Sequence, residues 1–228
     1  MRECEKGYLS PRWTGEIADC SLPMTLDTYS NCSFGCVYCF SQYQRGVGGS
    51  KDDYYNKNVK SVDPEKVKRI LRGEDETSQF YKYVKDRRPI QYGGLSDQFD
   101  GFEHQYGVTY EILKTLRELE YPVSFSTKSA WVFDDPKYRE LFKGADNWSV
   151  KFSIITLDEE DARRIEVGVP SPRKRLEAMR KYNELSKGGD DLEAKAVHSG
   201  SVRQNILRPY QGSPRRRSRS GHYRVFLP

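Results

Sequence analysis

Three cysteines within eight residues place the strongest constraint on this chain. The segment from Asn31 to Phe40 has the sequence NCSFGCVYCF, in which Cys32, Cys36 and Cys39 follow the spacing C-x3-C-x2-C. Three thiolates on one tight loop can face a common point, which suits an iron-sulfur cluster whose irons each take a sulfur ligand. Because a cubane cluster has four irons, this set of cysteines would leave one iron open to another ligand.

Zinc is the main alternative occupant of such a group of cysteines. A structural zinc site takes four protein ligands, usually with a second C-x2-C pair or an H-x3-5-H pair at a distance. Cys4 and Cys20 are too irregularly placed to supply that pair, and His104 stands alone. Zinc, plain buried thiols and a disulfide set therefore remain as the weaker interpretations.

Composition limits the class of protein. The chain has 228 residues, of which 36% are hydrophobic and 31% charged, and this suits one sizeable globular domain or part of a larger one. No run approaches the roughly 20 apolar residues of a membrane span, and the opening MRECEKGYLS lacks the apolar core of a signal peptide. We therefore expect a cytoplasmic protein with no membrane partner, in a reducing compartment that suits an oxygen-sensitive cluster.

The net charge of +5 would suggest a nucleic-acid partner if it were spread over the chain. Residues 190–228 hold eight Lys or Arg and three Asp or Glu, which leaves 30 of each in residues 1–189. The excess charge therefore lies in the tail, and it gives no support to a basic DNA-binding face on the main body.

Strand-like and helix-like patterns alternate after an irregular lead-in over residues 1–24. Short apolar runs predict strands, and caps followed by helical spacing predict helices. The expected strands cover 24–29, 89–92, 122–127 and 148–156, and the expected helices cover 63–72, 80–84, 109–119, 136–142, 158–166 and 171–188. This order predicts an α/β fold, a parallel sheet with helices outside it, in the form of a partial open (β/α) barrel. Polar residues at the carboxyl ends of its strands would form the site.

The cysteine spacing, with Tyr38 just before the last cysteine, resembles the signature of the radical S-adenosylmethionine (SAM) superfamily. The resemblance implies a 4Fe-4S cluster held by Cys32, Cys36 and Cys39, with the open iron chelating the amino and carboxylate groups of SAM. One electron from the cluster would cleave the sulfonium and yield a 5′-deoxyadenosyl radical, which abstracts hydrogen from a substrate. The cofactors supply the chemistry, and the protein supplies ligation and orientation. The resemblance also implies an electron donor such as flavodoxin or ferredoxin.

Over residues 11–189 the chain is most similar to the spore photoproduct lyase-like family of DNA-repair lyases. The similar segments are GGLSD at 93–97, STK at 126–128, KFSI at 151–154 and RIEVGVPSPRKRLEAMRKY at 164–182. The likeness implies that Ser96, Lys128 and Ser153 contact SAM, with Tyr38 and Gly94 near its adenine and methionine ends. Lysine can pair with a carboxylate, and hydroxyls can bond ribose or carboxylate oxygens. DNA is accordingly a candidate partner.

One position departs from that family. The lyases carry a cysteine as hydrogen-atom donor just before the serine-aspartate pair, and Leu95 stands there in this chain. Leucine cannot donate a hydrogen atom by that route, so the resemblance to the radical SAM class is firmer than any implied substrate. Two alternatives remain open, a radical SAM enzyme acting on RNA, a peptide or a small metabolite, and a non-catalytic iron-sulfur or zinc-binding protein.

The resemblance divides the chain into a lead-in over 1–24, a radical SAM core over 25–189 that is incomplete at its carboxyl terminus, and a basic tail over 190–228. The tail ends in SPRRRSRSGHYRVFLP, which has no helical or strand period. Back-translated with permitted codons and shifted by one base, the same segment can encode a strand, a turn, an amphipathic helix and another strand. We therefore hypothesise that residues from about Asp190 onward are disordered or a frameshift product. A stop codon in the shifted frame of the gene would exclude the frameshift.

Overall fold

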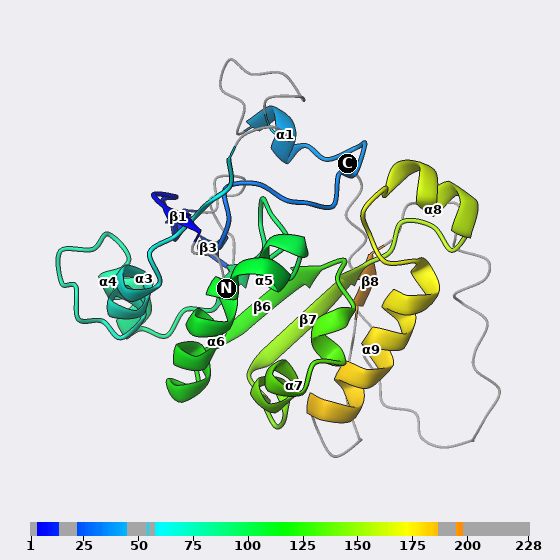
Figure 1. Cartoon of the computed structure of the whole chain (residues 1–228). Helices are drawn as coiled ribbons and strands as arrows, with labels where there is room; N and C mark the ends of the chain where they lie inside the picture. The colour runs from blue at the N-terminus through cyan, green and yellow to red at the C-terminus, as the bar shows by residue number, and fades with distance from the viewer. Residues whose placement is uncertain (1–3, 14–21, 45–53, 55–57, 187–194, 198–228) are drawn as a thin grey trace.

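A computed structural model of the chain describes residues 4–13, 22–44, 54, 58–186 and 195–197 (Figure 1). Its main sheet has the strand order β2-β3-β5-β6-β7-β8, and only β2 runs antiparallel to its neighbour. These strands are β2 (Arg12–Trp13), β3 (Met24–Leu26), β5 (Ile90–Tyr92), β6 (Val123–Thr127), β7 (Trp148–Ser153) and β8 (Lys195–Val197). A separate parallel pair joins β1 (Glu5–Lys6) to β4 (Lys60–Ser61).

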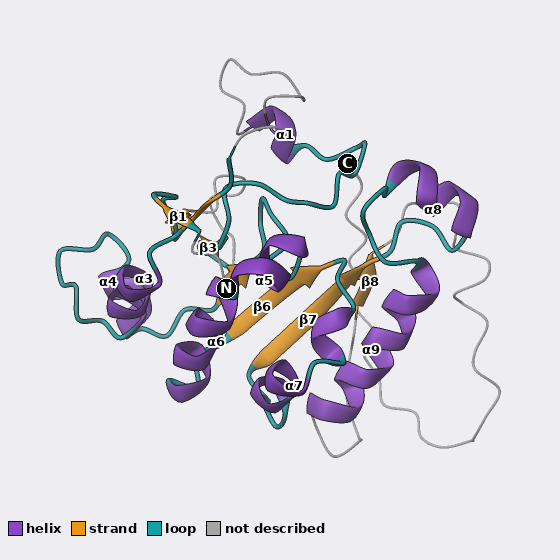
Figure 2. Ribbon diagram, in the orientation of Figure 1, coloured by secondary structure: helices purple, strands orange, loops and turns teal. Residues whose placement is uncertain are grey.

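Helices connect the parallel strands (Figure 2). They are α1 (Ser41–Gln44), α3 (Pro64–Leu71), α4 (Tyr81–Lys85), α5 (Gly101–Tyr106), α6 (Val108–Glu118), α7 (Pro136–Phe142), α8 (Glu159–Ile165) and α9 (Pro172–Ser186), with a 3-10 turn η1 (Trp131–Phe133). The side chains of Asp63, Asp135 and Asp158 cap α3, α7 and α8 by accepting bonds from backbone N–H groups of the first turn. Proline occupies the first position of α3 and α7, where a missing N–H costs nothing.

The two faces of the sheet differ in chemistry because successive strand residues point to opposite sides. One face carries buried apolar side chains that pack against the helices, as Phe125 does against Phe142 of α7 at a centroid distance of 5.8 Å. The other face carries polar side chains, and Gln91 donates from Nε2 to Ser126 Oγ at 2.9 Å across it. The hydrophobic core therefore lies between the sheet and its helices, and the polar face is left for other contacts.

A buried carboxylate fastens the helices to the loop after β3. Glu103 of α5 accepts hydrogen bonds from Tyr29 Oη at 2.6 Å and from the backbone N–H groups of Thr109 and Tyr110, each at 2.8 Å. Tyr138 of α7 donates to the same carboxylate. Burial raises the pKa of Glu103, and these donors satisfy the oxygens that burial removes from water.

The alternation of parallel strands and helices confirms the predicted α/β class and the partial open barrel. In the described part of the chain, β2 and β8 stand at opposite ends of the strand order and do not pair. The first predicted strand ends early, at Leu26, which pairs with the last residue of β5, Tyr92. Just beyond it, the carboxylate of Asp27 accepts bonds from Leu95 N and Ser96 N.

Strand β8 falls within the tail that the sequence analysis placed at 190–228. The other residues of that tail, 190–194 and 198–228, lie outside the described residues. The frameshift hypothesis therefore stays a prediction. In the described residues, every helix falls short of the length and apolarity needed to cross a bilayer.

Candidate functional site

The loop that joins β3 to α1 carries the cysteine motif and crosses the end of the sheet toward α8 (Figure 1). The thiols of Cys32, Cys36 and Cys39 are free, with Cys36 buried and the other two half-buried. Cys39 N donates to Cys36 O at 3.1 Å, so the last two cysteines share one tight turn. The rest of the loop must be held by its neighbours, because it belongs to no helix or strand.

The start of α5 holds one side of this loop. Asp100 caps α5 with Oδ1, which accepts from Phe102 N at 2.9 Å, while its Oδ2 accepts from Ser33 N at 2.5 Å. Gly101 N donates in return to Ser33 Oγ at 2.8 Å. One carboxylate therefore both starts the helix and positions the residue next to Cys32.

The segment between α8 and α9 holds the other side. Val37 N donates to Ile165 O at 2.9 Å, and Gly168 N donates to Phe34 O at 2.8 Å. A Cβ atom on Gly168 would lie only 2.9 Å from Phe34 O, so glycine is needed for the two backbones to approach this closely. The cysteine loop is thus clamped between two parts of the chain that follow different strands.

A single buried carboxylate joins the cysteine loop to the ends of β6 and β7. Glu166 Oε1 accepts from Tyr38 Oη at 2.5 Å and lies 3.4 Å from Lys128 Nζ, while Oε2 accepts from Arg175 Nη2 at 2.5 Å. Lys128 Nζ also donates to Ser153 Oγ and lies 5.5 Å from the centre of the Tyr38 ring. Arg175 Nη1 donates to Ser153 O at 2.6 Å. Three of the residues predicted to contact SAM, Tyr38, Lys128 and Ser153, therefore meet at one place.

The other two predicted SAM contacts, Gly94 and Ser96, lie just beyond β5. Ser96 is buried, and its hydroxyl donates to Tyr29 O at 3.0 Å, so this side chain is already engaged within the fold. A Cβ atom on Gly94 would lie 2.5 Å from Thr25 Oγ1 and 3.1 Å from Arg12 Nη2. Packing against β2 and β3 thus explains the glycine, and a role of Gly94 or Ser96 in SAM binding stays a prediction.

The environment of Cys32 and Cys36 favours the protonated thiol in the absence of a metal. Burial raises the pKa of Cys36 to about 11, although the charge of Lys128 acts in the opposite direction. Burial also raises the pKa of Cys32, and the carboxylates of Asp100 and Asp97 add to the effect. Metal coordination removes the thiol proton, so a bound cationic cluster would reverse this preference.

Three thiols on one loop are a donor set that an iron-sulfur cluster can use. In the described residues no group of three or more His, Cys, Asp or Glu side chains is arranged to hold a single metal ion. In a cubane cluster each thiolate binds a different iron, so the sulfurs do not converge on one ion. The Cys4 thiol donates to Val59 O at 3.6 Å beside β1, and Cys20 lies outside the described residues.

The structure adds residues to the site that sequence analysis gave no role. Asp97 accepts from Lys128 N at 2.6 Å and from Thr127 Oγ1, which fixes the backbone from which the Lys128 side chain extends. Glu166 and Arg175 fall in the segment 164–182, whose resemblance is to a glutamate-to-arginine helix entry, but neither residue was given a role. Their separation of nine residues gave one signal, since a carboxylate at the end of one helix can meet an arginine early in the next.

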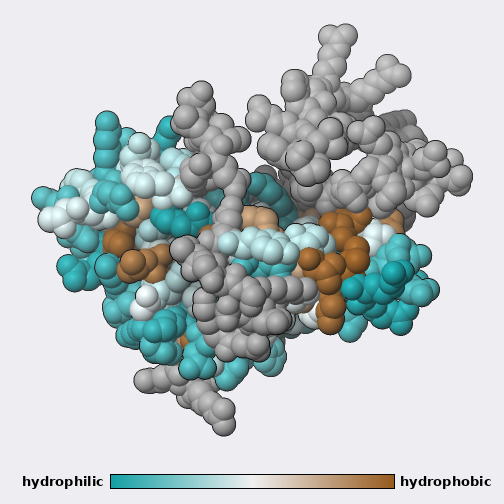
Figure 3. All heavy atoms as spheres, turned by 90° about the horizontal axis from the view of Figure 1, so that it is seen from above, coloured by the Kyte–Doolittle hydropathy of each residue, from teal (hydrophilic) through white to brown (hydrophobic). Residues whose placement is uncertain are grey.

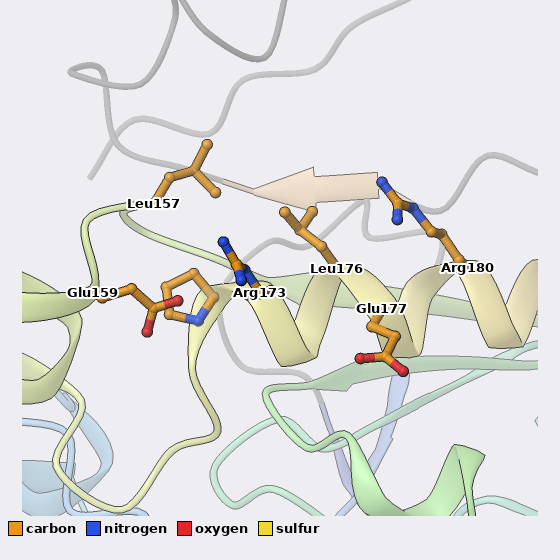
Figure 4. A pocket seen from close by; sticks show the side chains of 7 residues that line it. Leu157, Glu159, Arg173, Leu176, Glu177 and Arg180 are labelled. Carbon is orange, nitrogen blue, oxygen red and sulfur yellow. The ribbon is translucent and has the colours of Figure 1, made fainter. Parts of the chain in front are cut away.

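A cavity of about 540 Å³ lies away from this site, along α9 and the segment before α8 (Figure 4). It is lined by Leu157, Glu159, Pro172, Arg173, Leu176, Glu177 and Arg180. None of the cysteines and none of the predicted SAM contacts line it. Around the cysteine loop, by contrast, Val37, Phe40, Tyr43 and Val167 expose apolar side chains, and hydrophobic surface is visible in the view from above (Figure 3).

Comparison with known proteins identifies the fold. No protein-family model and no curated protein matches the chain. Spore photoproduct lyase complexed with dinucleoside spore photoproduct aligns with a TM-score of 0.55 and 19% identity over 85% of this chain and 48% of that chain. A mutant of the same enzyme aligns over the same shares of both chains, with a TM-score of 0.56 and 18% identity. SuiB of Streptococcus suis bound to S-adenosylmethionine aligns with a TM-score of 0.49 and 19% identity over 82% of this chain and 37% of the SuiB chain.

The chain therefore shares the fold of spore photoproduct lyase. It spans about half the length of those solved chains, 48% in each case. At such low identities the likeness concerns the fold alone, and chemistry has to be argued from the residues of the site.

Proposed function

We propose that this chain is a radical SAM protein that holds a 4Fe-4S cluster through Cys32, Cys36 and Cys39. The observation that carries the proposal is the meeting of the three-cysteine loop with Lys128 and Ser153 at the ends of adjacent parallel strands. The chemistry supplied by such a cluster when bound is one-electron cleavage of SAM to a 5′-deoxyadenosyl radical. The fold shared with spore photoproduct lyase supports this assignment.

The side chains at the strand ends would bind and orient SAM. Lys128 offers an ammonium group to the carboxylate of SAM, and the Ser153 hydroxyl offers a hydrogen bond to a ribose or carboxylate oxygen. Tyr38 is 46% exposed and presents a ring on the same side as the Lys128 ammonium group, where it can cover the adenine. Fixing these groups before binding reduces the entropy lost when the sulfonium is brought to the open iron.

The proposed substrate class follows the resemblance only in part. DNA is the first candidate, as for the spore photoproduct lyase-like family, in a cytoplasmic setting with flavodoxin or ferredoxin as electron donor. Leu95, whose N–H is bonded to Asp27 Oδ1 at 2.7 Å, offers no S–H group to return a hydrogen atom. This residue favours a second candidate, a radical SAM enzyme that acts on RNA, a peptide or a small metabolite.

Anaerobic reconstitution of the full chain with iron, sulfide and thiol tests the proposal. We expect a brown protein with one 4Fe-4S cluster by iron analysis and electron paramagnetic resonance (EPR), and release of 5′-deoxyadenosine from SAM after reduction. The release should be measured alone and with ultraviolet-damaged DNA, so that cleavage of SAM is separated from substrate turnover. Binding of zinc in place of a cluster, or a cluster without any cleavage of SAM, would count against the proposal.

A further inference from the structure

The pair formed by Glu166 and Arg175 is more deeply buried than the residues it contacts. Their side chains are 1% and 0% exposed, whereas the Lys128 side chain is 16% exposed. Burying two charges is costly unless both are paired and hydrogen-bonded. Such a pair therefore calls for an explanation beyond the packing of α8 against α9.

Each end of this pair contacts a different part of the site. Arg175 reaches β7 through Ser153 O, and Glu166 reaches the cysteine loop through Tyr38 Oη and the end of β6 through Lys128 Nζ. The backbone of Glu166 also forms an isolated antiparallel bridge with Cys36. The pair thus connects a cysteine of the motif to both strand ends that carry the SAM-binding side chains.

We propose that Glu166 and Arg175 are positioning residues. They hold the side chains of Tyr38 and Lys128 in place beside the cysteine loop before SAM binds. The identity of the ligand, SAM, rests on the proposed function. The position of the cysteine loop is argued from contacts within this chain alone. Arg175 orients the Glu166 carboxylate through Oε2, so that Oε1 is left to hold the two groups that face the ligand. A lysine and a tyrosine held in this way lose less freedom on binding.

The electrostatics give the pair a role that a neutral residue could not fill. Arg175 and Lys128 both lie within 3.4 Å of the Glu166 carboxylate oxygens and would repel each other without its charge. Replacing Glu166 by glutamine keeps a hydrogen-bond acceptor for Tyr38 but removes the charge that keeps Lys128 against the end of β7. We expect Lys128 to move away and the loop at Cys36 to open more often.

The first test uses cluster-free protein and needs no SAM. The rate at which iodoacetamide modifies Cys36 is followed by mass spectrometry in the native chain and in Glu166→Gln, with Glu160→Gln as the matched control on an exposed carboxylate of α8. Cys36 is 7% exposed, and its rate is compared per thiolate, from the dependence of the rate on pH, so that it reports opening of the loop and not the loss of the Glu166 charge beside the thiol. We expect roughly tenfold faster modification in Glu166→Gln and no change in Glu160→Gln. Equal rates in all three proteins would overturn the positioning of the loop.

The second test separates positioning from simple stabilisation. The dissociation constant for SAM is measured in reconstituted protein from the change that SAM causes in the EPR signal of the reduced cluster. We expect it to rise about 10- to 100-fold in Glu166→Gln. The double variant Glu166→Gln with Arg175→Met removes both buried charges, and its thermal stability should recover because no unpaired charge remains. Its affinity for SAM should stay weak. Recovery of affinity together with stability would show a merely structural pair and overturn the inference.

The two tests also distinguish failure of this inference from failure of the proposed function. If the native chain binds neither a cluster nor SAM, the proposed function fails, and the modification rates of Cys36 still decide whether the pair positions the loop. If the native chain binds SAM and Glu166→Gln binds it equally well, the proposed function stands and the positioning role is wrong.

Discussion

At the scale of single residues, the proposed chemistry depends on side chains that are tied to the protein in the ligand-free chain. Lys128 is bonded to Ser153 Oγ and paired with Glu166, so SAM must compete with these partners for the ammonium group. The thiol of Cys36 is buried, and burial raises its pKa to about 11. A cluster must therefore displace its proton on binding.

Lys128→Ala and Ser153→Ala should weaken SAM binding and spare the cluster. Loss of a hydrogen bond to a charged group corresponds to roughly a 10- to 100-fold higher dissociation constant for Lys128→Ala, and loss of a neutral hydroxyl to a smaller increase. Equilibrium binding to reconstituted protein, with iron content measured in parallel, gives both numbers. Lys114→Ala, a partly exposed lysine of α6, is the control, and unchanged binding in both site variants would remove these assignments.

Cys36→Ala should abolish the cluster because it deletes one of three thiolate ligands, with no replacement from the described residues. Iron and sulfide content and the visible absorption of the reconstituted protein measure the loss. Cys4→Ala is the matched control, since this half-buried thiol contacts Val59 O beside β1. An intact cluster in Cys36→Ala, or its loss in Cys4→Ala, would mean that the ligands are wrongly assigned.

At the scale of elements, the cysteine loop owes its position to the start of α5 and to the segment between α8 and α9. Asp100 holds Ser33 on one side, and Gly168 lies against the carbonyl groups of Ser33 and Phe34 on the other. The first contact needs the Asp100 carboxylate, whereas the second joins backbone to backbone and depends on how closely the two segments approach.

Gly168→Ala should therefore displace the loop. Its Cβ would lie 2.9 Å from Phe34 O and 3.1 Å from Ser33 O, and backbone atoms cannot rotate away as a side chain can. We expect a loss of about 1–3 kcal/mol in the free energy of unfolding, measured with urea. Gly101→Ala is the control, because its Cβ would meet only side-chain atoms of Ser33, Oγ at 3.0 Å and Cβ at 3.6 Å. An equal loss in both variants would contradict the explanation.

At the scale of the whole molecule, an aromatic core links the sheet to its helices. Phe142 contacts the rings of Phe99, Phe125, Trp148 and Tyr182 at centroid distances between 5.5 and 6.0 Å. Several buried tyrosines belong to the same core or its edges. They are Tyr29, Tyr92, Tyr121, Tyr138 and Tyr182.

Alkaline pH should unfold this core in a way that the tyrosines report. Burial raises the pKa of all five tyrosines, to about 12 for Tyr121 and Tyr182. Because the folded pKa is raised, their contribution to stability is complete below the unfolded pKa of about 10 and is lost as pH rises from there. Phenolate absorbance should thus show a group of tyrosines that ionise only at higher pH than the others. Circular dichroism should show that the protein unfolds over the same pH range. Ionisation of all 16 tyrosines near pH 10 with intact secondary structure would contradict this.

The amino-acid sequence by itself determined the features that depend on near neighbours. The spacing of Cys32, Cys36 and Cys39, the aspartate caps and the alternation of strand and helix all follow from residues a few positions apart. For this reason the α/β class and the partial open barrel could be predicted, as could the position of Lys128 directly after a strand.

Only the tertiary structure decided what surrounds those residues. Tyr38 and Glu166 are 128 positions apart in the sequence. Their hydrogen bond exists because the cysteine loop packs against the segment between α8 and α9 in the folded chain. Likewise, the hydroxyl of Ser96 proved to point to Tyr29 O, which no spacing could indicate. Hydrogen bonds and buried charge pairs depend on distances of a few ångströms in space, and the folded path of the chain alone sets those distances.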